Sequence, residues 1–118
     1  MHELAIAQAI VESAEQELEP AQRVLKLRLQ VGALSGVVEE ALRFGFDLAT
    51  QDTPLAGCLL EVESMPVTLY CHVCQRLYEP PELFRLICPN CQQVSNDLRS
   101  GRELLIVAME VDFEPAYS

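Results

Sequence analysis

Basic residues are scarce in this chain of 118 residues. Eight lysines and arginines stand against eighteen aspartates and glutamates, which gives a formal net charge of −10. A surface of this charge repels phosphate backbones and anionic lipid headgroups alike. The composition therefore argues against nucleic acid and against a membrane surface as partners, and it favours cationic or metal-bearing ones.

Long hydrophobic segments are also missing, although 50% of the residues are hydrophobic. The longest uninterrupted apolar run, Leu104 to Met109, is far shorter than the roughly 20 residues of a membrane-spanning helix. Residues 1–19 contain several glutamates but neither lysine nor arginine, the reverse of the basic start of a secretory signal peptide. We therefore expect a cytoplasmic location, where cysteines more often bind metal than form structural disulfides.

The residues that most catalytic sites need are few. The chain has two histidines and no serine in a nucleophile-elbow context, so neither a Ser-His-Asp nor a Cys-His arrangement is indicated. Glycine-rich phosphate loops are absent as well. Glu39 and Glu40 point in different directions from a predicted helix, which is typical of a solvated first turn rather than an acid–base pair. The sequence predicts a protein that is not an enzyme.

Two stretches have the periodicity of amphipathic helices. The first covers residues 3–18 and ends before a proline. The second follows the turn at 32–36, is predicted to be capped by Ser35 or Gly36, and should stop before Asp52. Its predicted buried stripe consists of Val38, Leu42, Phe46 and Ala49.

Three further segments have the alternation or the apolar composition of strands. They are residues 23–31, residues 59–63 with a possible extension to 70, and residues 103–112. We therefore predict an α+β fold, a small domain of helices and a three-stranded sheet built from residues 1–66 and 102–118. The intervening residues 67–101 are predicted to form an inserted module.

The predicted module contains two Cys-x-x-Cys turns. Their cysteines are Cys71, Cys74, Cys88 and Cys91. Four thiolates in two tight turns are the set that a tetrahedral structural zinc ion needs. Because this segment is loop-like and could hardly form an apolar core alone, the metal would take the place of that core. We predict a zinc-ribbon-like module, although the same thiolates could bind iron as in rubredoxin-like sites.

Four further residues carry expectations, three of them within the Cys-x-x-Cys turns or directly after them. Gln75 and Gln92 directly follow the second cysteine of each turn, where zinc knuckles commonly have glycine because a positive φ angle is needed. His72 is redundant once four thiolates bind, so we expect it beside the site or facing solvent. Cys58, the fifth cysteine, is predicted to be a small buried hydrophobic residue.

The chain begins Met1-His2-Glu3, which offers a second kind of metal site. A bulky second residue generally leaves the initiator methionine in place, so the α-amine should be free. This amine, the backbone nitrogen of His2 and its imidazole can close two fused chelate rings around Ni(II) or Cu(II). Protons compete for these nitrogens, so binding should weaken as the pH falls. A histidine at position 2 is nevertheless more often only an exposed side chain, and the spacing alone leaves this site open.

Several motifs, in one order along nearly the whole chain, can be set beside a known family. They are Met1-His2-Glu3-Leu4, Gly32-Ala33-Leu34-Ser35-Gly36-Val37, Glu40-Ala41-Leu42-Arg43-Phe44, the two Cys-x-x-Cys turns with Cys88-Pro89, and Ser100-Gly101-Arg102-Glu103-Leu104. In these motifs the chain resembles the HypA/HybF hydrogenase maturation factors, which are nickel metallochaperones.

The resemblance implies a site and a function. Nickel would bind at Met1, His2 and Glu3, with Glu40 as a further acidic residue linked to that site, and zinc would bind at the four cysteines. The family captures Ni(II), exchanges it with the GTPase HypB and delivers it to the large-subunit precursor of a [NiFe] hydrogenase, and in some organisms it also serves urease. The sequence leaves open whether the chain also pairs with itself as a dimer.

A zinc-ribbon adaptor for protein or nucleic-acid partners is the alternative. Its module would have no basic stripe, because its charges nearly balance. They are Arg76, Arg85, Arg99, Arg102, Glu79, Glu82 and Asp97. In either case the module could be a rigid surface that contacts a partner, or its metal could have only the structural role of holding the chain together.

Overall fold

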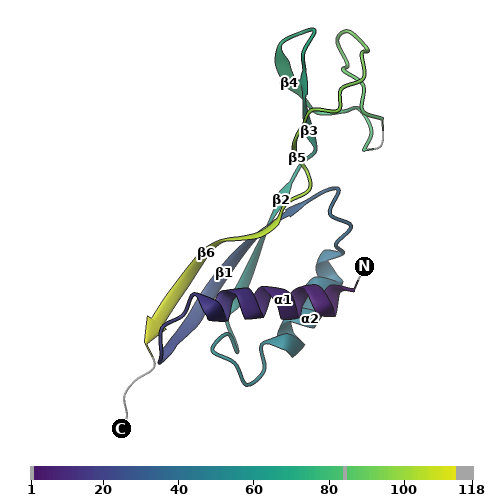
Figure 1. Ribbon diagram of the computed structural model, residues 1–118. Helices are drawn as coiled ribbons and strands as arrows, with labels where there is room; N and C mark the ends of the chain where they lie inside the picture. The colour runs from purple at the N-terminus through teal and green to yellow at the C-terminus, as the bar shows by residue number, and fades with distance from the viewer. Residues whose placement is uncertain (1, 84, 114–118) are drawn as a thin grey trace. The chain divides into compact units, whose positions relative to one another are not determined.

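The computed structural model describes residues 2–83 and 85–113, and these residues form two compact units (Figure 1). The first unit comprises the described residues of 1–29, 37–63 and 105–118, and the second comprises Gln30–Gly36 and Ser64–Leu104. Helices and two small sheets are both present, so the predicted α+β class is confirmed.

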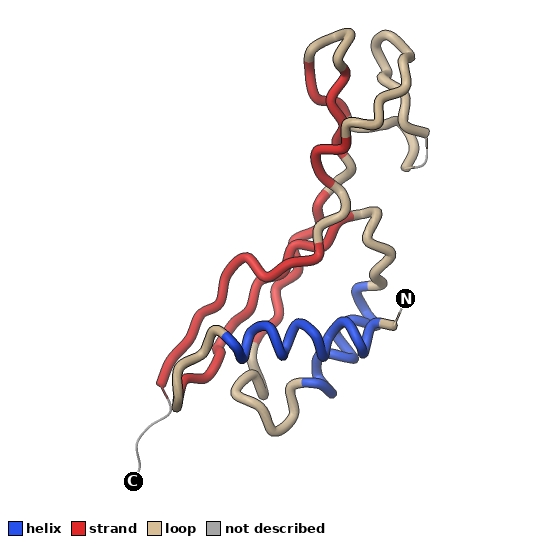
Figure 2. Tube along the Cα trace, in the orientation of Figure 1, coloured by secondary structure: helices blue, strands red, loops and turns tan. Residues whose placement is uncertain are grey.

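Two helices and a three-stranded sheet dominate the first unit. The helices are α1 (Glu3–Gln16) and α2 (Glu39–Ala49), and the strands are β1 (Gln22–Gly32), β2 (Leu59–Met65) and β6 (Leu104–Phe113). The sheet has the order β2-β1-β6, so β1 is its central strand. Figure 2 shows α1 crossing the strands, as the blue segment that leads from the N-terminus. All three predicted strands are therefore present in one sheet.

The core of the first unit comes from the predicted apolar faces. Its buried side chains are Ala7, Ile10, Val11 and Ala14 of α1, Leu42 and Phe46 of α2, and Val24, Leu27, Leu29, Leu55 and Leu60. On the other face of β1, Lys26 and Arg28 reach Glu61 of β2 with N···O distances of 3.3 Å. The alternation of apolar and charged residues along β1 thus separates a buried face from an exposed one.

The predicted start of α2 is wrong. The residue that caps the helix is Val38, not Ser35 or Gly36, and no side chain of its own turn bonds there. Instead, the carboxylate of Glu3 accepts the backbone N–H of Val38 at 3.2 Å. A partner from another helix therefore replaces the local cap. Val38 is also 58% exposed, so it does not belong to the buried stripe.

The second unit is a smaller sheet of three short strands. They are β3 (Thr68–Cys71), β4 (Arg76–Tyr78) and β5 (Leu98–Ser100), in the antiparallel order β4-β3-β5. The possible extension of the second predicted strand to residue 70 is in fact a separate strand, β3. The break falls at Pro66, which has no N–H to donate to a sheet.

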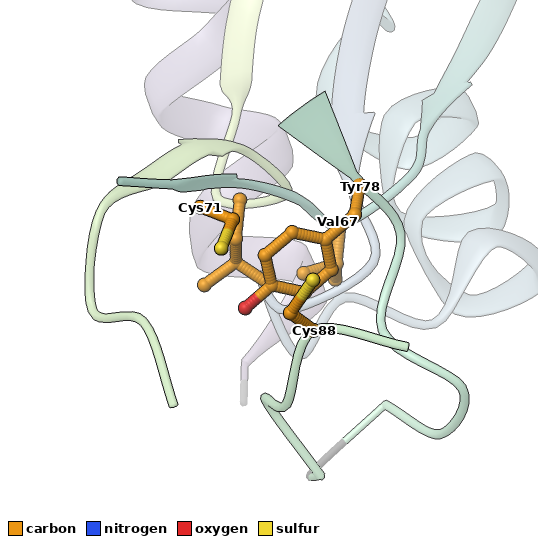
Figure 3. Close-up of a cluster of buried hydrophobic side chains, with 5 residues drawn as sticks. Val67, Cys71, Tyr78 and Cys88 are labelled. Carbon is orange, nitrogen blue, oxygen red and sulfur yellow. The ribbon is translucent and has the colours of Figure 1, made fainter. Parts of the chain in front are cut away.

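A small apolar cluster lies in this second unit, part of which is drawn in Figure 3. Its buried members are Val67, Leu69, Cys71, Tyr78 and Cys88. The hydroxyl of Tyr78 donates to the carbonyl of Leu86 at 3.1 Å, so the buried phenol is satisfied. Residues 67–101 therefore form more of a core than expected, but two of its five buried members are cysteines of the Cys-x-x-Cys turns.

No helix within the described residues has both the length and the apolarity to span a membrane.

Gly32 lies where two backbone segments nearly touch. A Cβ atom at this position would stand 2.2 Å from the carbonyl carbon and oxygen of Gly101. Around it, the N–H of Gly32 donates to the carbonyl of Glu103 at 2.7 Å, and that of Leu34 donates to the carbonyl of Gly101 at 2.6 Å. Only a residue without a side chain permits this approach.

We therefore expect Gly32→Ala to lower the free energy of unfolding by about 3 kcal/mol, because the added methyl meets backbone atoms that cannot rotate away. Gly57→Ala is the matched control. Gly57 has φ +77° but nothing within 4 Å of its Cβ position, so this change should cost only about 1–2 kcal/mol of backbone strain. Denaturant unfolding of both variants measures the difference, and equal losses would show that the close approach is not a constraint.

Candidate metal sites

The four cysteines of the two turns come together at one point. Their sulfur atoms all lie within 4.8 Å of one another, and none of them forms a disulfide. The sulfurs of Cys71 and Cys91 are 3.6 Å apart, and those of Cys74 and Cys88 are 4.0 Å apart. A tetrahedral ion with metal–sulfur bonds of about 2.3 Å places its sulfurs about 3.8 Å apart. The cluster therefore has the dimensions of a four-thiolate metal site.

Local backbone geometry produces this convergence. The first turn joins β3 to β4, since Cys71 ends one strand and Arg76 begins the other. In the second turn the N–H of Gln92 donates to the carbonyl of Cys88 at 2.8 Å. Gln75 has φ 55° and Gln92 has φ 64°, so both positions adopt the positive angle that the pattern requires, without glycine.

N–H groups point at two of the four sulfurs. The backbone N–H of Cys74 donates to the sulfur of Cys71 at 3.3 Å, and the side-chain amide of Asn90 donates to the sulfur of Cys74 at 3.2 Å. The backbone N–H of Cys91 lowers the pKa of Cys88 to about 6, whereas the pKa of Cys91 is raised, because desolvation and the neighbouring sulfurs outweigh the backbone N–H of Gln93. Because the thiolate is the form that binds metal, the lowered pKa of Cys88 suits this residue to a metal site.

His72 lies outside the group of sulfurs. Its side chain is 68% exposed, and its Nε2 atom is 2.7 Å from a carboxylate oxygen of Asp97. Asp97 also accepts two N–H groups of Arg99, at 2.8 and 2.9 Å, and this guanidinium is the main cause that lowers the pKa of Asp97 to about 2. Arg99 in turn lies 4.6 Å from the ring centre of Tyr70. No local pattern indicated this network, because 25 residues separate His72 from Asp97.

His2 stands at the exposed end of α1. It is the N-cap residue, its carbonyl accepts the N–H of Ile6 at 3.1 Å, and its side chain makes no capping bond. Met1 lies outside the described residues. A hollow of about 300 Å³ has His2 in its lining, together with Glu3, Leu4, Ala41, Phe44, Gly45 and Leu48.

The two acidic residues of the predicted nickel site are held differently. The N–H of Val38 is the main cause that lowers the pKa of Glu3, so this carboxylate stays ionised below its usual range. Glu40 is exposed in the first turn of α2, next in sequence to Ala41 of the hollow. Within residues 2–83 and 85–113, the only group of three or more potential ligand side chains is the cysteine cluster.

The fifth cysteine differs from its expectation. Cys58 is half-buried rather than buried, and desolvation raises the pKa of its thiol. It follows Gly57, whose φ of +77° turns the chain just before β2. This turn at the edge of the core leaves Cys58 partly open, and the sequence pattern could not show that.

Comparison with known proteins places the chain in a family. The family model described as "Hydrogenase/urease nickel incorporation, metallochaperone, hypA" matches residues 1–111. A hydrogenase maturation factor HypA of Roseiflexus sp. (strain RS-1) is 40% identical over 114 residues, which cover 95% of this chain and 93% of the relative. A hydrogenase maturation factor HypA of Chloroflexus aurantiacus is 43% identical over 114 residues, which cover 93% of this chain and 98% of the relative.

The fold is also found in a solved structure. The solution structure of the Ni metallochaperone HypA from Helicobacter pylori matches with a TM-score of 0.69, over 97% of this chain and 100% of that one. With 18% sequence identity, this match shows a common fold. The family model and the curated relatives go further, and by them this chain belongs to the HypA family of metallochaperones for nickel incorporation, which are maturation factors and not enzymes.

Proposed function

We propose that this chain binds Ni(II) at its amino terminus and delivers it, in the cytoplasm, for the maturation of a [NiFe] hydrogenase. The observation that carries the proposal is the position of His2 in a chain of this family. Its imidazole is exposed at the end of α1 and is not engaged in capping that helix. The nitrogen-rich ligand set of a Met-His start suits Ni(II).

The end of α1 supports metal capture without loss of structure. The first N–H groups of a helix have no intrahelical acceptor, so the backbone nitrogen of His2 can release its proton to water and bind a metal while α1 stays intact. Glu3 is anchored to Val38, which fixes the residue after His2. In this proposal Met1 and His2 supply the nitrogen ligands, and Glu3 and Glu40 supply negative charge beside the dication.

The resident metal of the second unit is proposed to be Zn(II), held by Cys71, Cys74, Cys88 and Cys91. Support comes from the sulfur distances and from the N–H groups directed at the sulfurs. Zinc in such a site contributes folding free energy and carries out no chemistry of its own. Accordingly, we assign nickel handling to residues 1–66 with 102–118, and zinc binding to residues 67–101.

The partners proposed are those of the family, a HypB-type GTPase and the large-subunit precursor of the hydrogenase. The adaptor alternative has less support. It gives no role to the Met1-His2-Glu3 start, whereas the family model begins at residue 1.

The two histidines of the chain allow a matched test of the nickel site. We expect His2→Ala to abolish stoichiometric nickel binding, because the imidazole ligand is lost, and a residue added before Met1 should do the same by displacing the α-amine. His72→Ala is the control, since this exposed histidine lies in the other unit. Calorimetric titration with nickel and metal analysis measure the outcome, and wild-type nickel affinity in the His2→Ala variant would contradict the proposal.

The five cysteines allow a similar test of the zinc site. The wild-type chain and Cys58→Ser should each bind one zinc ion, whereas Cys88→Ser should lose zinc and the folded signals of Leu69 and Tyr78. Signals of α1 and α2 should persist in all three proteins, because both helices lie in the other unit. Metal analysis and amide NMR spectra check this. Iron in the purified protein, or full zinc in Cys88→Ser, would contradict the assignment.

A further inference from the structure

Large apolar side chains lie exposed where α1 begins beside α2. Leu4 is 44% exposed, Phe44 is 68% exposed and Leu48 is 45% exposed. Together with Ala41 and Gly45 they line the hollow of about 300 Å³ that also includes His2 and Glu3. We refer to Leu4, Ala41, Phe44, Gly45 and Leu48 as the α1–α2 apolar face.

Close packing of the two helices creates this face. A Cβ atom at Gly45 would stand 3.1 Å from the Cα of Leu4 and 3.4 Å from the carbonyl oxygen of Glu3. The missing side chain lets the first turn of α1 approach α2, and Gly45 itself lies in the lining of the hollow. Phe44 and Leu48 are four residues apart, so their side chains project from the same side of α2. A grouped apolar surface of this kind is typical of an interaction site.

The surroundings of the face are acidic. Glu40 and Asp47 are four residues before and three residues after Phe44, so both flank it on α2, and both are exposed. The only cation in the two helices is Arg43. Its guanidinium is already engaged, since it donates to the carboxylate of Glu39 at 2.9 Å and to the carbonyl of Leu60 at 2.8 Å. A partner that binds the α1–α2 apolar face would therefore contact apolar side chains flanked by negatively charged ones.

We propose that the α1–α2 apolar face docks a cationic segment of the protein with which this chain exchanges nickel. An apolar side chain of that segment enters the hollow above Gly45, and its lysines or arginines face Glu40 and Asp47. A second copy of this chain fits poorly, because each copy carries a net charge of −10 and would place acidic rims together. This inference rests on the proposed function, since it takes the partner to be one that exchanges nickel.

The position of His2 gives this docking a consequence. His2 lines the same hollow as Phe44 and Leu48, so a segment seated there covers the end of α1. Metal ligands of the partner are then brought beside the nickel, and bulk water is displaced during exchange. The face would thus couple partner recognition to transfer, with the apolar contacts supplying affinity and the acidic rim supplying orientation.

The probes are the purified HypB-type GTPase and the hydrogenase large-subunit precursor from the same organism, each titrated against the full chain by biolayer interferometry. For at least one probe, Phe44→Ala and Leu48→Ala should each weaken binding by about tenfold, as expected for a central contact. Leu59→Ala, which removes a side chain of similar exposure from the sheet, should change the affinity by less than about twofold.

The salt dependence of binding tests the acidic surroundings of the face. Wild-type affinity should fall as NaCl rises from about 50 to about 300 mM, and Asp47→Asn should reduce that dependence.

Three outcomes would overturn this inference. They are a failure of both probes to bind the wild-type chain, wild-type affinity in Phe44→Ala, and self-association of the chain that Phe44→Ala abolishes. Nickel titration of Phe44→Ala without a partner separates the two proposals, since its nickel stoichiometry should remain that of wild type. If His2→Ala kept its nickel while Phe44→Ala lost its partner, the assignment of the nickel site would fail and the docking face would stand.

Discussion

The packing of the first turn of α1 against α2 is the contact on which the proposed nickel site depends. Gly45 permits an approach of 3.1 Å between its Cβ position and the Cα of Leu4, and Glu3 binds the N–H of Val38 at the start of α2. These two contacts fix residues 3 and 4 while His2, one residue earlier, remains exposed. A short terminal segment thus gains a defined position on the surface without being buried in it.

The second unit is stabilised in another way. Its sheet consists of strands of three or four residues, and its apolar cluster has five buried members, two of which are cysteines. An assembly of this size buries little apolar surface, so a metal ion bound by four thiolates can contribute much of its folding free energy. Gln75 and Gln92 both have positive φ angles, because the two turns that bring the sulfurs together require this backbone conformation. A positive φ is unfavourable for any residue that carries a Cβ atom.

Arginines in both units are held in local ion pairs and hydrogen bonds. The helices of the first unit carry acidic residues and a single arginine, whose guanidinium is already bonded to Glu39 and Leu60. The second unit holds its exposed Arg99 and His72 against Asp97. Within the described residues, neither arrangement forms a basic stripe of the kind that follows a phosphate backbone.

Much of the fold follows from short-range patterns. The alternation along β1, the apolar stripe of α1 and the spacing of the four cysteines each depend on residues close in sequence, and each pattern predicted its element. The start of α2 could not be predicted in this way, because the N–H of its N-cap residue Val38 is bound by the carboxylate of Glu3, 35 residues away. Val38 and Cys58 were misplaced for a related reason, since burial depends on which elements pack above a residue.

Sequence patterns alone indicated the candidate ligands and most of the helices and strands, since ligand chemistry and hydrophobic periodicity are properties of the residues and their spacing. The sequence also carried the family, through motifs that lie in one order along the chain. The surroundings of those candidate ligands became visible only in the folded chain. The convergence of the sulfurs, the anchoring of Glu3 and the apolar face beside His2 all require segments distant in sequence to meet, and their positions are set by the packing of the whole unit.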